Sequence, residues 1–393
     1  MKRDDFTADR AAHLVLVREH EPPYWAFVPP SLPPEPGTLD WSDVRLRRAL
    51  SDADHGMGEL AGLGRAIPNP HLLIAPFVRR EAVLSSRIEG TRAGIQEVYA
   101  YESGQLPLPG MEADEVADIR EVTNYVRALE FGLERMAEGQ RVGLWLVREL
   151  HRLLMDGVRG ERQHPGQFRT IQNFVGKGES IEEATFVPPP PLQMRQCLDL
   201  WERYVTVEDE EAPLVRLALI HYQFEAIHPF QDGNGRIGRL LISLLLVAWD
   251  LLPLPLLYLS AFFEANRETY YRRLQEVSQR GAWQPWVTFF LHGVAEQARD
   301  AVRRARELQD LRERWRAALV AENAASSVVA LTEWLFDTPI ISAPKAQGLL
   351  GVTHRTASLA IQRLEDAGLL VRLEDTSHPR RYAAREILRV LEV

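Results

Sequence analysis

Residues 228–239 read His-Pro-Phe-Gln-Asp-Gly-Asn-Gly-Arg-Ile-Gly-Arg, and this segment constrains the fold more than any other part of the chain. Pro229 has no backbone N–H and disfavours the helical conformation of the residue before it, so the apolar run 213–227 should end at His228. The glycines that follow favour a tight turn with positive φ. The apolar run 237–249 then predicts a second helix. The segment therefore predicts a helix, turn and helix, with His228 at the end of the first helix.

The same segment carries the groups needed to bind phosphate and to activate a hydroxyl. Successive N–H groups in the Gly-Asn-Gly turn, at the start of a helix, form a concave nest for anions. Arg236 and Arg239 are three residues apart, so we expect them on one face, where both can clamp phosphate oxygens. A neutral imidazole at His228 can accept a hydroxyl proton near pH 7. A lone His-Pro would equally suit a helix stop with a surface histidine, but the combination indicates a nucleoside triphosphate site.

The segment resembles the signature of the Fic family, His-Pro-Phe-x-Asp-Gly-Asn-Gly-Arg-x-Gly-Arg, and matches it at every fixed position. This resemblance implies a mainly α-helical Fic-type core with a β-hairpin flap. It also implies transfer of AMP from ATP to a Ser, Thr or Tyr hydroxyl of a target protein or of the chain itself. His228 would be the catalytic base, Asp232 would hold Mg²⁺, and ATP would be bound by Gly233, Asn234, Gly235, Arg236, Gly238 and Arg239.

A second resemblance lies upstream, where Ser-Ser-Arg-Ile-Glu-Gly begins at Ser85 and fits the inhibitory-helix pattern Ser/Thr-x-x-x-Glu-Gly/Asn. We expect one helix over 74–89, with Pro76 in its first turn, so Ser85 and Glu89 share a face. A carboxylate near a helix C-terminus is disfavoured by the dipole, which indicates a cation partner, although a solvated surface Glu is the ordinary alternative. The resemblance implies that Glu89 pairs with Arg239 and occupies the space of the γ-phosphate.

Other reactions stay open. Proteins with similar motifs transfer UMP, phosphocholine or a phosphate, and some self-restrained members remove AMP with the same glutamate. The complete motif favours AMP. A further alternative is a transcription regulator in which the Fic core only senses ATP.

Residues 162–191 are rich in Gly, Thr, Val and Pro and show little helical repetition, which predicts a short hairpin. Within them, 165–169 resembles the segment leading into the Fic flap. An edge strand could hold a target by its main chain, largely irrespective of side chains. A crossing loop held by prolines is the alternative. The residues expected to form the target-docking flap are Thr185, Phe186, Val187 and Pro188.

The C-terminal residues show a helix, turn, helix and ribbon pattern that resembles a winged helix-turn-helix domain. We expect helices at 328–336, 342–349 and 353–367, and strands at 370–373 and 380–382. From residue 341 onward, 8 Lys and Arg face 6 Asp and Glu, a balance of +2 in a chain of net charge −9. The domain would serve either DNA binding or protein docking and dimerisation. The DNA-facing side chains would be His354, Arg355, Ser358 and Gln362, with Arg380 and Arg381 near phosphates.

The pattern predicts four parts: an N-terminal helical module with the inhibitory helix (1–110), the catalytic core (111–290), a connecting helix (291–325) and the winged-helix domain (326–393). The proline-rich stretch 21–37 suits an extended strap with aromatic anchors, or less well a ligand for a proline-recognising domain. A long amphipathic helix over 286–319 has a charged solvated face, and a homodimer seam is the alternative.

Composition limits the partners and the compartment. A net charge of −9 disfavours a surface that binds nucleic acid as a whole. A lone Cys197 cannot form an intramolecular disulfide, and no Cys/His spacing suits zinc, so we expect a reducing cytoplasm. The N-terminus lacks the apolar stretch of a secretory signal. The most apolar segment, 240–249, is shorter than the roughly 20 residues of a spanning helix, so we expect no membrane partner.

Overall fold

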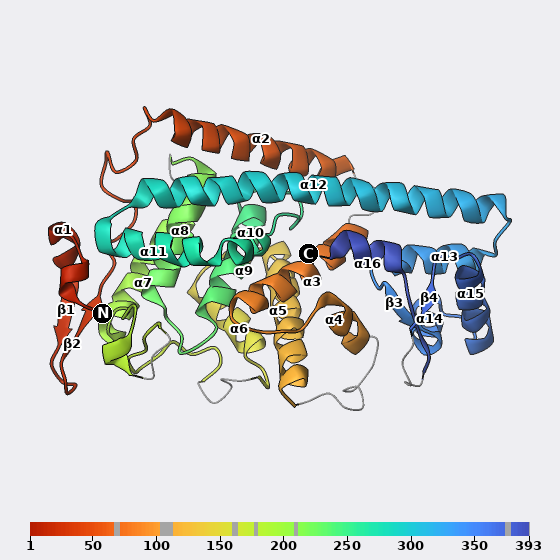
Figure 1. The fold of residues 1–393 in the computed structure, drawn as a ribbon, viewed down its shortest axis with the longest axis horizontal. Helices are drawn as coiled ribbons and strands as arrows, with labels where there is room; N and C mark the ends of the chain where they lie inside the picture. The colour runs from red at the N-terminus through yellow and green to blue at the C-terminus, as the bar shows by residue number, and fades with distance from the viewer. Residues whose placement is uncertain are drawn as a thin grey trace.

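The computed structural model describes residues 1–66, 71–102, 113–158, 164–176, 180–207, 211–373 and 379–392. The described chain is mainly helical, as predicted, and two small sheets lie at its two ends (Figure 1). The helices before the segment 228–233 are α1 (Ala8–Ala11), α2 (Val44–Ala66), α3 (His71–Ile88), α4 (Ile95–Glu102), α5 (Ala113–Ala137), α6 (Leu144–Leu154), α7 (Pro191–Thr206) and α8 (Pro213–Ile227). Those after it are α9 (Asn234–Ala248), α10 (Ser260–Ala265), α11 (Arg267–Arg280), α12 (Trp283–Ala321), α13 (Ser326–Leu335), α14 (Ala343–Leu350), α15 (His354–Asp366) and α16 (Arg385–Leu391).

Helices α8 and α9 form the centre of the core. Both are apolar around most of their circumference, and nearly every residue of each is buried. A helix without a polar face is stable only when other elements surround it. Helices α5, α6, α7 and α12 pack against this pair. The corner between α8 and α9, residues 228–233, is therefore held from several sides.

Helix α12 runs along the length of the molecule, with α2 packed beside it (Figure 1). Gly56 of α2 makes this approach close, because a Cβ there would lie 3.0 Å from the Cβ of Ala298. Toward its C-terminal end α12 packs on the C-terminal residues, where the rings of Trp315 and Phe336 are 5.6 Å apart. The predicted long amphipathic helix is confirmed, and its apolar stripe is covered within the chain.

The proline-rich stretch contributes strand β2 (Tyr24–Phe27), which pairs antiparallel with β1 (Leu14–Val17). The N–H of Phe27 donates to the carbonyl oxygen of Val187 over 2.9 Å, and the terminal amine of Met1 donates to that of Ala184. This hairpin is thus fastened to the segment predicted to form the flap.

Helix α3 begins at His71, three residues before the predicted start, so Pro76 lies in its second turn rather than its first. The helix ends at Ile88, one residue before the predicted end, and Gly90 in the turn that follows adopts φ +103°, which favours glycine. Ser85 therefore lies in the last turn of α3, and Glu89 follows the helix directly.

The C-terminal residues form α13, β3 (Ile340–Ser342), α14, α15, β4 (Val371–Arg372), β5 (Arg381–Ala383) and α16, with strand order β3-β5-β4. Thr353 caps α15 as predicted, since its Oγ1 accepts from the N–H of Thr356. The wing interpretation stays a prediction, and part of its loop, 374–378, lies outside the described residues. One detail was wrong: Arg381 is buried, because β5 is the middle strand, so it cannot reach a phosphate.

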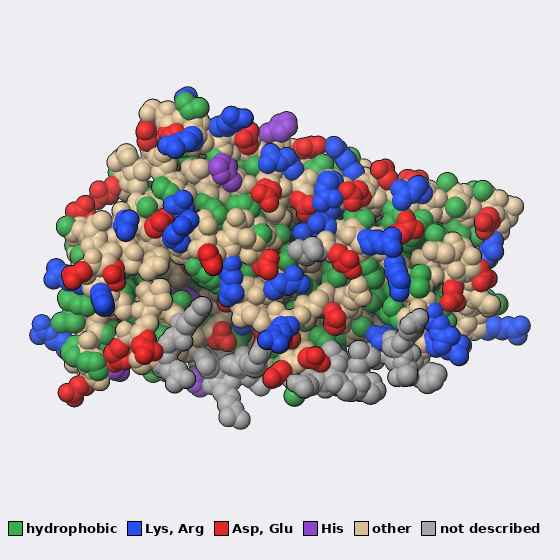
Figure 2. Space-filling model, in the orientation of Figure 1, with side chains coloured by type: hydrophobic (Ala, Val, Ile, Leu, Met, Phe, Trp, Pro, Cys, Tyr) green, Lys and Arg blue, Asp and Glu red, His purple; other side chains and the backbone are tan. Residues whose placement is uncertain are grey.

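No described helix is long and apolar enough to cross a membrane. On the face drawn in Figure 2, Lys and Arg side chains are interspersed with Asp and Glu over α12 and the C-terminal helices.

Candidate functional site

His228 lies immediately after α8 in the left-handed region, at φ 51°. Its Nδ1 is 3.2 Å from the carbonyl oxygen of Glu225. A carbonyl can only accept, so Nδ1 carries the proton and Nε2 keeps its lone pair. Burial lowers the pKa of His228 to about 4, so the imidazole is neutral at pH 7. The side chain is therefore prepared to accept a proton at Nε2.

The turn after His228 leaves backbone N–H groups free of the helical ladder. Gly233 adopts φ 78° and precedes α9, whose first ladder bond runs from the N–H of Ile237 to the carbonyl of Gly233. The N–H groups of residues 234–236 therefore precede the ladder and point from the helix start. The amide of Asn234 is used differently: it accepts from the N–H of Phe230 and donates to its carbonyl, both over 2.8 Å. Asn234 thus builds the loop with its side chain.

Two residues from the segment 164–176 hold this loop from outside. Arg169 is 2% exposed, and its Nε donates to the carbonyl of His228 while its N–H donates to that of Pro229, each over 2.9 Å. Asn173 donates to the carbonyl of Phe230 over 2.7 Å. Both fix the backbone on either side of the candidate base.

His151 of α6 also holds this loop in place. Its ring stacks on Phe230 with centroids 3.7 Å apart. Nδ1 accepts from the N–H of Gly166 over 2.9 Å, so Nε2 is the donor to the carbonyl of Asp232 over 3.0 Å. Sequence reasoning missed His151, Arg169 and Asn173, because each acts on a segment that only folding brings near.

At this turn the Asp232 side chain is partly exposed, whereas the Arg236 side chain is buried. The Asp232 carboxylate accepts from the N–H of Gly233 over 2.6 Å and lies 3.7 Å from Arg236. Arg236 is directed mainly at the buried Glu121, with Nη1 3.0 Å from Oε2. Across the described ranges no three His, Cys, Asp or Glu side chains gather as a metal site. Asp232 would therefore supply one hard oxygen ligand, and the remaining ligands would have to come from the nucleotide and water.

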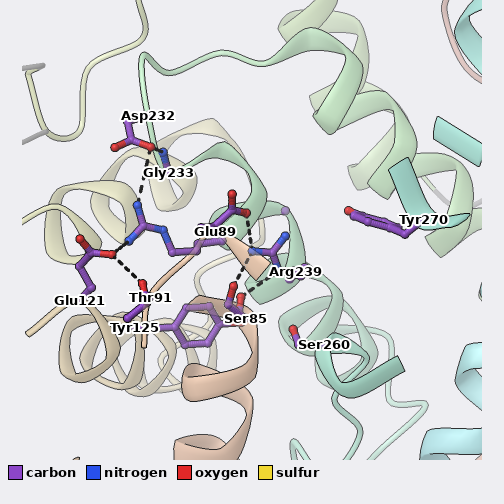
Figure 3. Close-up of polar contacts among 12 residues, drawn as sticks. Ser85, Glu89, Thr91, Glu121, Tyr125, Asp232, Gly233, Arg239, Ser260 and Tyr270 are labelled. Carbon is purple, nitrogen blue, oxygen red and sulfur yellow. Dashed lines mark hydrogen bonds and ion pairs between the residues drawn. The ribbon is translucent and has the colours of Figure 1, made fainter. Parts of the chain in front are cut away.

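Arg239 points toward Ser85 and Glu89 at the end of α3 (Figure 3). Its Nη2 is 2.7 Å from Oε1 of Glu89, and its Nε donates to Oγ of Ser85 over 2.9 Å. Nη2 also donates to the carbonyl of Ser85 over 2.9 Å. The two arginines of the motif thus bind separate carboxylates, Glu121 and Glu89, in this structure, and their joint clamp on phosphate stays a prediction.

The Glu89 carboxylate lies over the start of α9. A Cβ added to Gly235 would be 2.4 Å from Oε1 of Glu89. Burial raises the pKa of this carboxyl, but the charge and hydrogen bond of Arg239 outweigh it, and the net pKa is lowered. The Arg239 side chain is 2% exposed, and the Glu89 side chain is 34% exposed. The arginine is therefore a cation fixed in the core, whereas the glutamate is an anion that can be displaced. The carboxylate occupies space directly in front of the anion nest.

Two buried carboxylates were also missed by the sequence reading. Glu225 lies beside Gly238, where an added Cβ would be 2.4 Å from its Oε1, and that oxygen has no hydrogen-bond partner. Glu81 of α3 accepts from Ser260 and Tyr125. Burial raises the pKa of each carboxyl to about 7. Glu81 ties α3 to α10 and α5, which helps to fix the helix that carries Glu89.

Within the described residues, the predicted short hairpin contains one backbone bridge. Val175 and Phe186 exchange backbone hydrogen bonds of 2.8 and 3.0 Å, and Thr185 also donates to the carbonyl of Val175. The carbonyl of Val187 accepts from Phe27, and that of Pro188 accepts from Gln172. Residues 177–179, inside the predicted hairpin, lie outside the described part of the chain.

Comparison with known proteins places these features in a family. Residues 142–246 match the sequence model of the Fic/DOC family, and residues 47–134 match that of the Fic/DOC family N-terminal module. The chain is a Fic domain protein. It contains both the Fic core and the N-terminal module that accompanies it.

Curated relatives carry the name protein adenylyltransferase. The chain is 26% identical over 213 residues to "Protein adenylyltransferase Fic" of Nematostella vectensis, covering 52% of this chain and 44% of the relative. It is 26% identical over 207 residues to "Protein adenylyltransferase fic-1" of Caenorhabditis elegans, covering 51% and 37%. The chain thus spans less than half the length of these relatives.

Solved structures support the fold. A Fic family protein from Desulfovibrio desulfuricans G20 aligns with a TM-score of 0.55 at 21% identity, covering 91% of this chain and 98% of that one. A Fic domain-containing signaling protein from Bacteroides thetaiotaomicron aligns with a TM-score of 0.53 at 17% identity, covering 65% and 97%.

Proposed function

We propose that this protein is an adenylyltransferase that moves AMP from ATP to a Ser, Thr or Tyr hydroxyl of a protein, and that Glu89 restrains it. The proposal rests on one observation. Within residues 228–239, the neutral His228 with its free Nε2 lone pair lies next to the turn whose N–H groups form the anion nest. The names of the curated relatives agree with it.

In the proposed reaction the triphosphate lies against the N–H groups of residues 234–236. His228 Nε2 takes the proton of the target hydroxyl as its oxygen forms a bond to the α-phosphorus. The bond between the α-phosphorus and the bridging oxygen breaks, and pyrophosphate leaves with that electron pair. The nest stabilises charge that develops on the α-phosphate, and loss of one such donor typically costs a factor of about 100 to 1,000 in rate.

Magnesium fits the donor set at the turn. Asp232 offers a hard carboxylate oxygen at the mouth of the nest, with its side chain 47% exposed. Mg²⁺ prefers one or two carboxylates plus substrate phosphates, and it would neutralise phosphate charge. Arg239 would bind the γ-phosphate, Arg236 would support the phosphate site, and Gly238 would keep α9 close to its neighbours.

Glu89 would restrain the enzyme in two ways. It pairs with Arg239 over 2.7 Å, which removes that guanidinium from the γ-phosphate. Its carboxylate also lies in front of Gly235, where it would repel a triphosphate. Ser85 holds Arg239 in the same position. The resting protein should therefore be slow but not inactive.

The test uses ATP labelled at the α-phosphate, the full chain and a cell lysate. Glu89→Gly should increase labelling of the chain or of targets, and His228→Ala in the same background should abolish it. The mass added to a labelled target separates AMP from UMP, phosphocholine or phosphate. Equal labelling by the wild type and the Glu89→Gly protein would refute the restraint.

The target would dock on the flap residues Thr185, Phe186, Val187 and Pro188. For its main chain to pair with Val187, the hydrogen bond from Phe27 must first be replaced. Removal of AMP by the same site would need Glu89 to position water, so adding a labelled target to the wild-type protein tests for loss of label.

A further inference from the structure

A cleft with a volume of about 360 Å³ lies on the side of α3 away from the nest. It is formed by three distant parts of the chain: Arg80, Val83 and Arg87 of α3, residues 94–97 at the start of α4, and residues 391–392 at the end of α16. This volume equals roughly twelve water molecules. The cleft therefore has room for a small molecule.

The floor of the cleft is cationic. The Arg80 side chain is 8% exposed, and its Nε is buried without a hydrogen-bond partner. Its Nη2 lies 3.5 Å from Asp300, but Asp300 also pairs with Arg303 and Arg304, so three guanidiniums share that carboxylate. Burial lowers the pKa of Arg80 to about 10, and Arg304 acts in the same direction. Arg80 is thus a buried cation whose charge is incompletely balanced.

The walls of the cleft add further anion-binding groups. The half-buried Arg87 follows Arg80 two turns along the same face of α3. The first ladder bond of α4 runs from Val98 to Gly94, so the N–H groups of residues 95–97 are free of the ladder and carry the positive end of the helix dipole. Val83 and Leu391 are apolar lining residues, and both are almost fully buried.

Two carboxylates also line the cleft, and one of them, Glu97, folds back over Gly94, where an added Cβ would be 2.6 Å from its Oε2, so an anion at the start of α4 has to displace it. Glu97 and Glu392 are exposed, and Glu392 is held at one side by a 2.9 Å hydrogen bond from Gln96. Exposed charges are screened by water and salt, whereas Arg80 at the floor is not. An anion that reaches the floor therefore meets the unscreened cation.

We propose that this cleft binds a small phosphorylated molecule and that its occupation strengthens the restraint by Glu89. The regulatory part rests on the proposed function. Residues two positions apart on an α-helix point about 200° apart, so Arg87 faces the cleft while Ser85 and Glu89 face Arg239. An anion bound to Arg80, Arg87 and the start of α4 holds α3 in the position in which Glu89 contacts Arg239. A ligand that favours one arrangement shifts the population toward it.

Binding is tested by calorimetry on the full chain with inorganic phosphate as the probe, at constant ionic strength. Arg87→Gln should weaken the affinity about tenfold, the effect of losing one charge-assisted hydrogen bond. Arg87 is chosen because none of the ion pairs described above depends on it, and the exposed Arg45→Gln is the matched control. Equal affinity in the wild type and Arg87→Gln, or no saturable binding, would overturn the site.

Regulation is tested by labelling from ATP, with and without phosphate. Phosphate should lower labelling by the wild type and leave Arg87→Gln and Glu89→Gly unaffected. Equal inhibition of Glu89→Gly would mean that phosphate only competes with ATP at the nest, which overturns the regulatory part. If Glu89→Gly labels nothing, the proposed transferase fails, and the calorimetric comparison still decides the site.

Discussion

The carboxylate of Glu89 lies 2.7 Å from the guanidinium of Arg239, although the two residues are 150 positions apart in the chain. The arginine belongs to the buried α9 and cannot move without disturbing the core, since it is 2% exposed. The glutamate lies in the turn directly after α3, which ends at Ile88, only three residues after Ser85. The contact therefore joins a rigid element to one that can be displaced.

Ser85→Ala should release part of the restraint. It removes the hydroxyl that accepts from Nε of Arg239, a charge-assisted hydrogen bond whose loss we expect to weaken the closed arrangement by about 1 kcal/mol. Labelling from ATP should rise about fivefold, less than in Glu89→Gly. Ser86→Ala is the matched control, because Ser86 is equally buried and its hydroxyl has no hydrogen-bond partner. A similar rise in both variants would show that helix stability, rather than the Arg239 contact, is responsible.

Arg169→Lys should slow the chemistry more than it weakens ATP binding. Lysine keeps the charge but cannot fork to the carbonyls of His228 and Pro189, so the base loses its fixed position. A misplacement of about 1 Å can cost about 100-fold. Labelling rate and ATP affinity are measured in the Glu89→Gly background, with the exposed Arg152→Lys as control. A parallel loss of ATP affinity would indicate that Arg169 shapes the nest instead.

The contribution of Glu81 and Glu225 to stability should fall as the pH rises from 5 to 8, whereas buried neutral histidines such as His228 act in the opposite direction below pH 6.5. Burial raises the pKa of Glu81 and Glu225 from 4.5 to about 7 in the folded state. A carboxyl with a raised folded pKa contributes stability that is fully present below pH 4.5 and is lost as the pH passes 7. Glu81→Gln should remove roughly 1 to 3 kcal/mol of this decline, measured by urea unfolding at each pH. The exposed Glu134→Gln should leave the decline unchanged, and an unaltered slope in Glu81→Gln would contradict the assignment.

The full chain should not retard DNA fragments in gels at about 150 mM salt. Its net charge is −9, and Arg381, one of the two arginines predicted for the wing, is buried in the middle strand of its sheet. On α15, His354, Arg355 and Gln362 are exposed, but of these only Arg355 is a permanent cation for phosphate contacts. Salt-dependent retardation that disappears in Arg355→Ala would support a DNA-binding regulator. Retained ATP binding without any labelling by Glu89→Gly would strengthen that alternative.

The twelve-residue corner was predictable because its information is local. Pro229 ends α8, Gly233 permits the turn, and the apolar residues after it form α9, so His228 and the free N–H groups follow from neighbours in the chain. The same holds for the cap at Thr353 and the stop at Gly90. The pairing of Glu89 with Arg239 was predicted only from the resemblance to the family.

The amino-acid sequence by itself determined the two helices that flank the corner and the chemistry that the corner carries, since backbone conformation there depends mainly on adjacent residues. Tertiary structure alone decided which distant groups meet that corner: Arg169, Asn173 and His151 beneath the loop, Glu121 on Arg236, and Glu225 beside Gly238. It also decided that Arg236 and Arg239 contact different carboxylates. These contacts depend on how helices pack across long stretches of chain, and hydrogen bonds between such positions leave no periodic signal in the sequence.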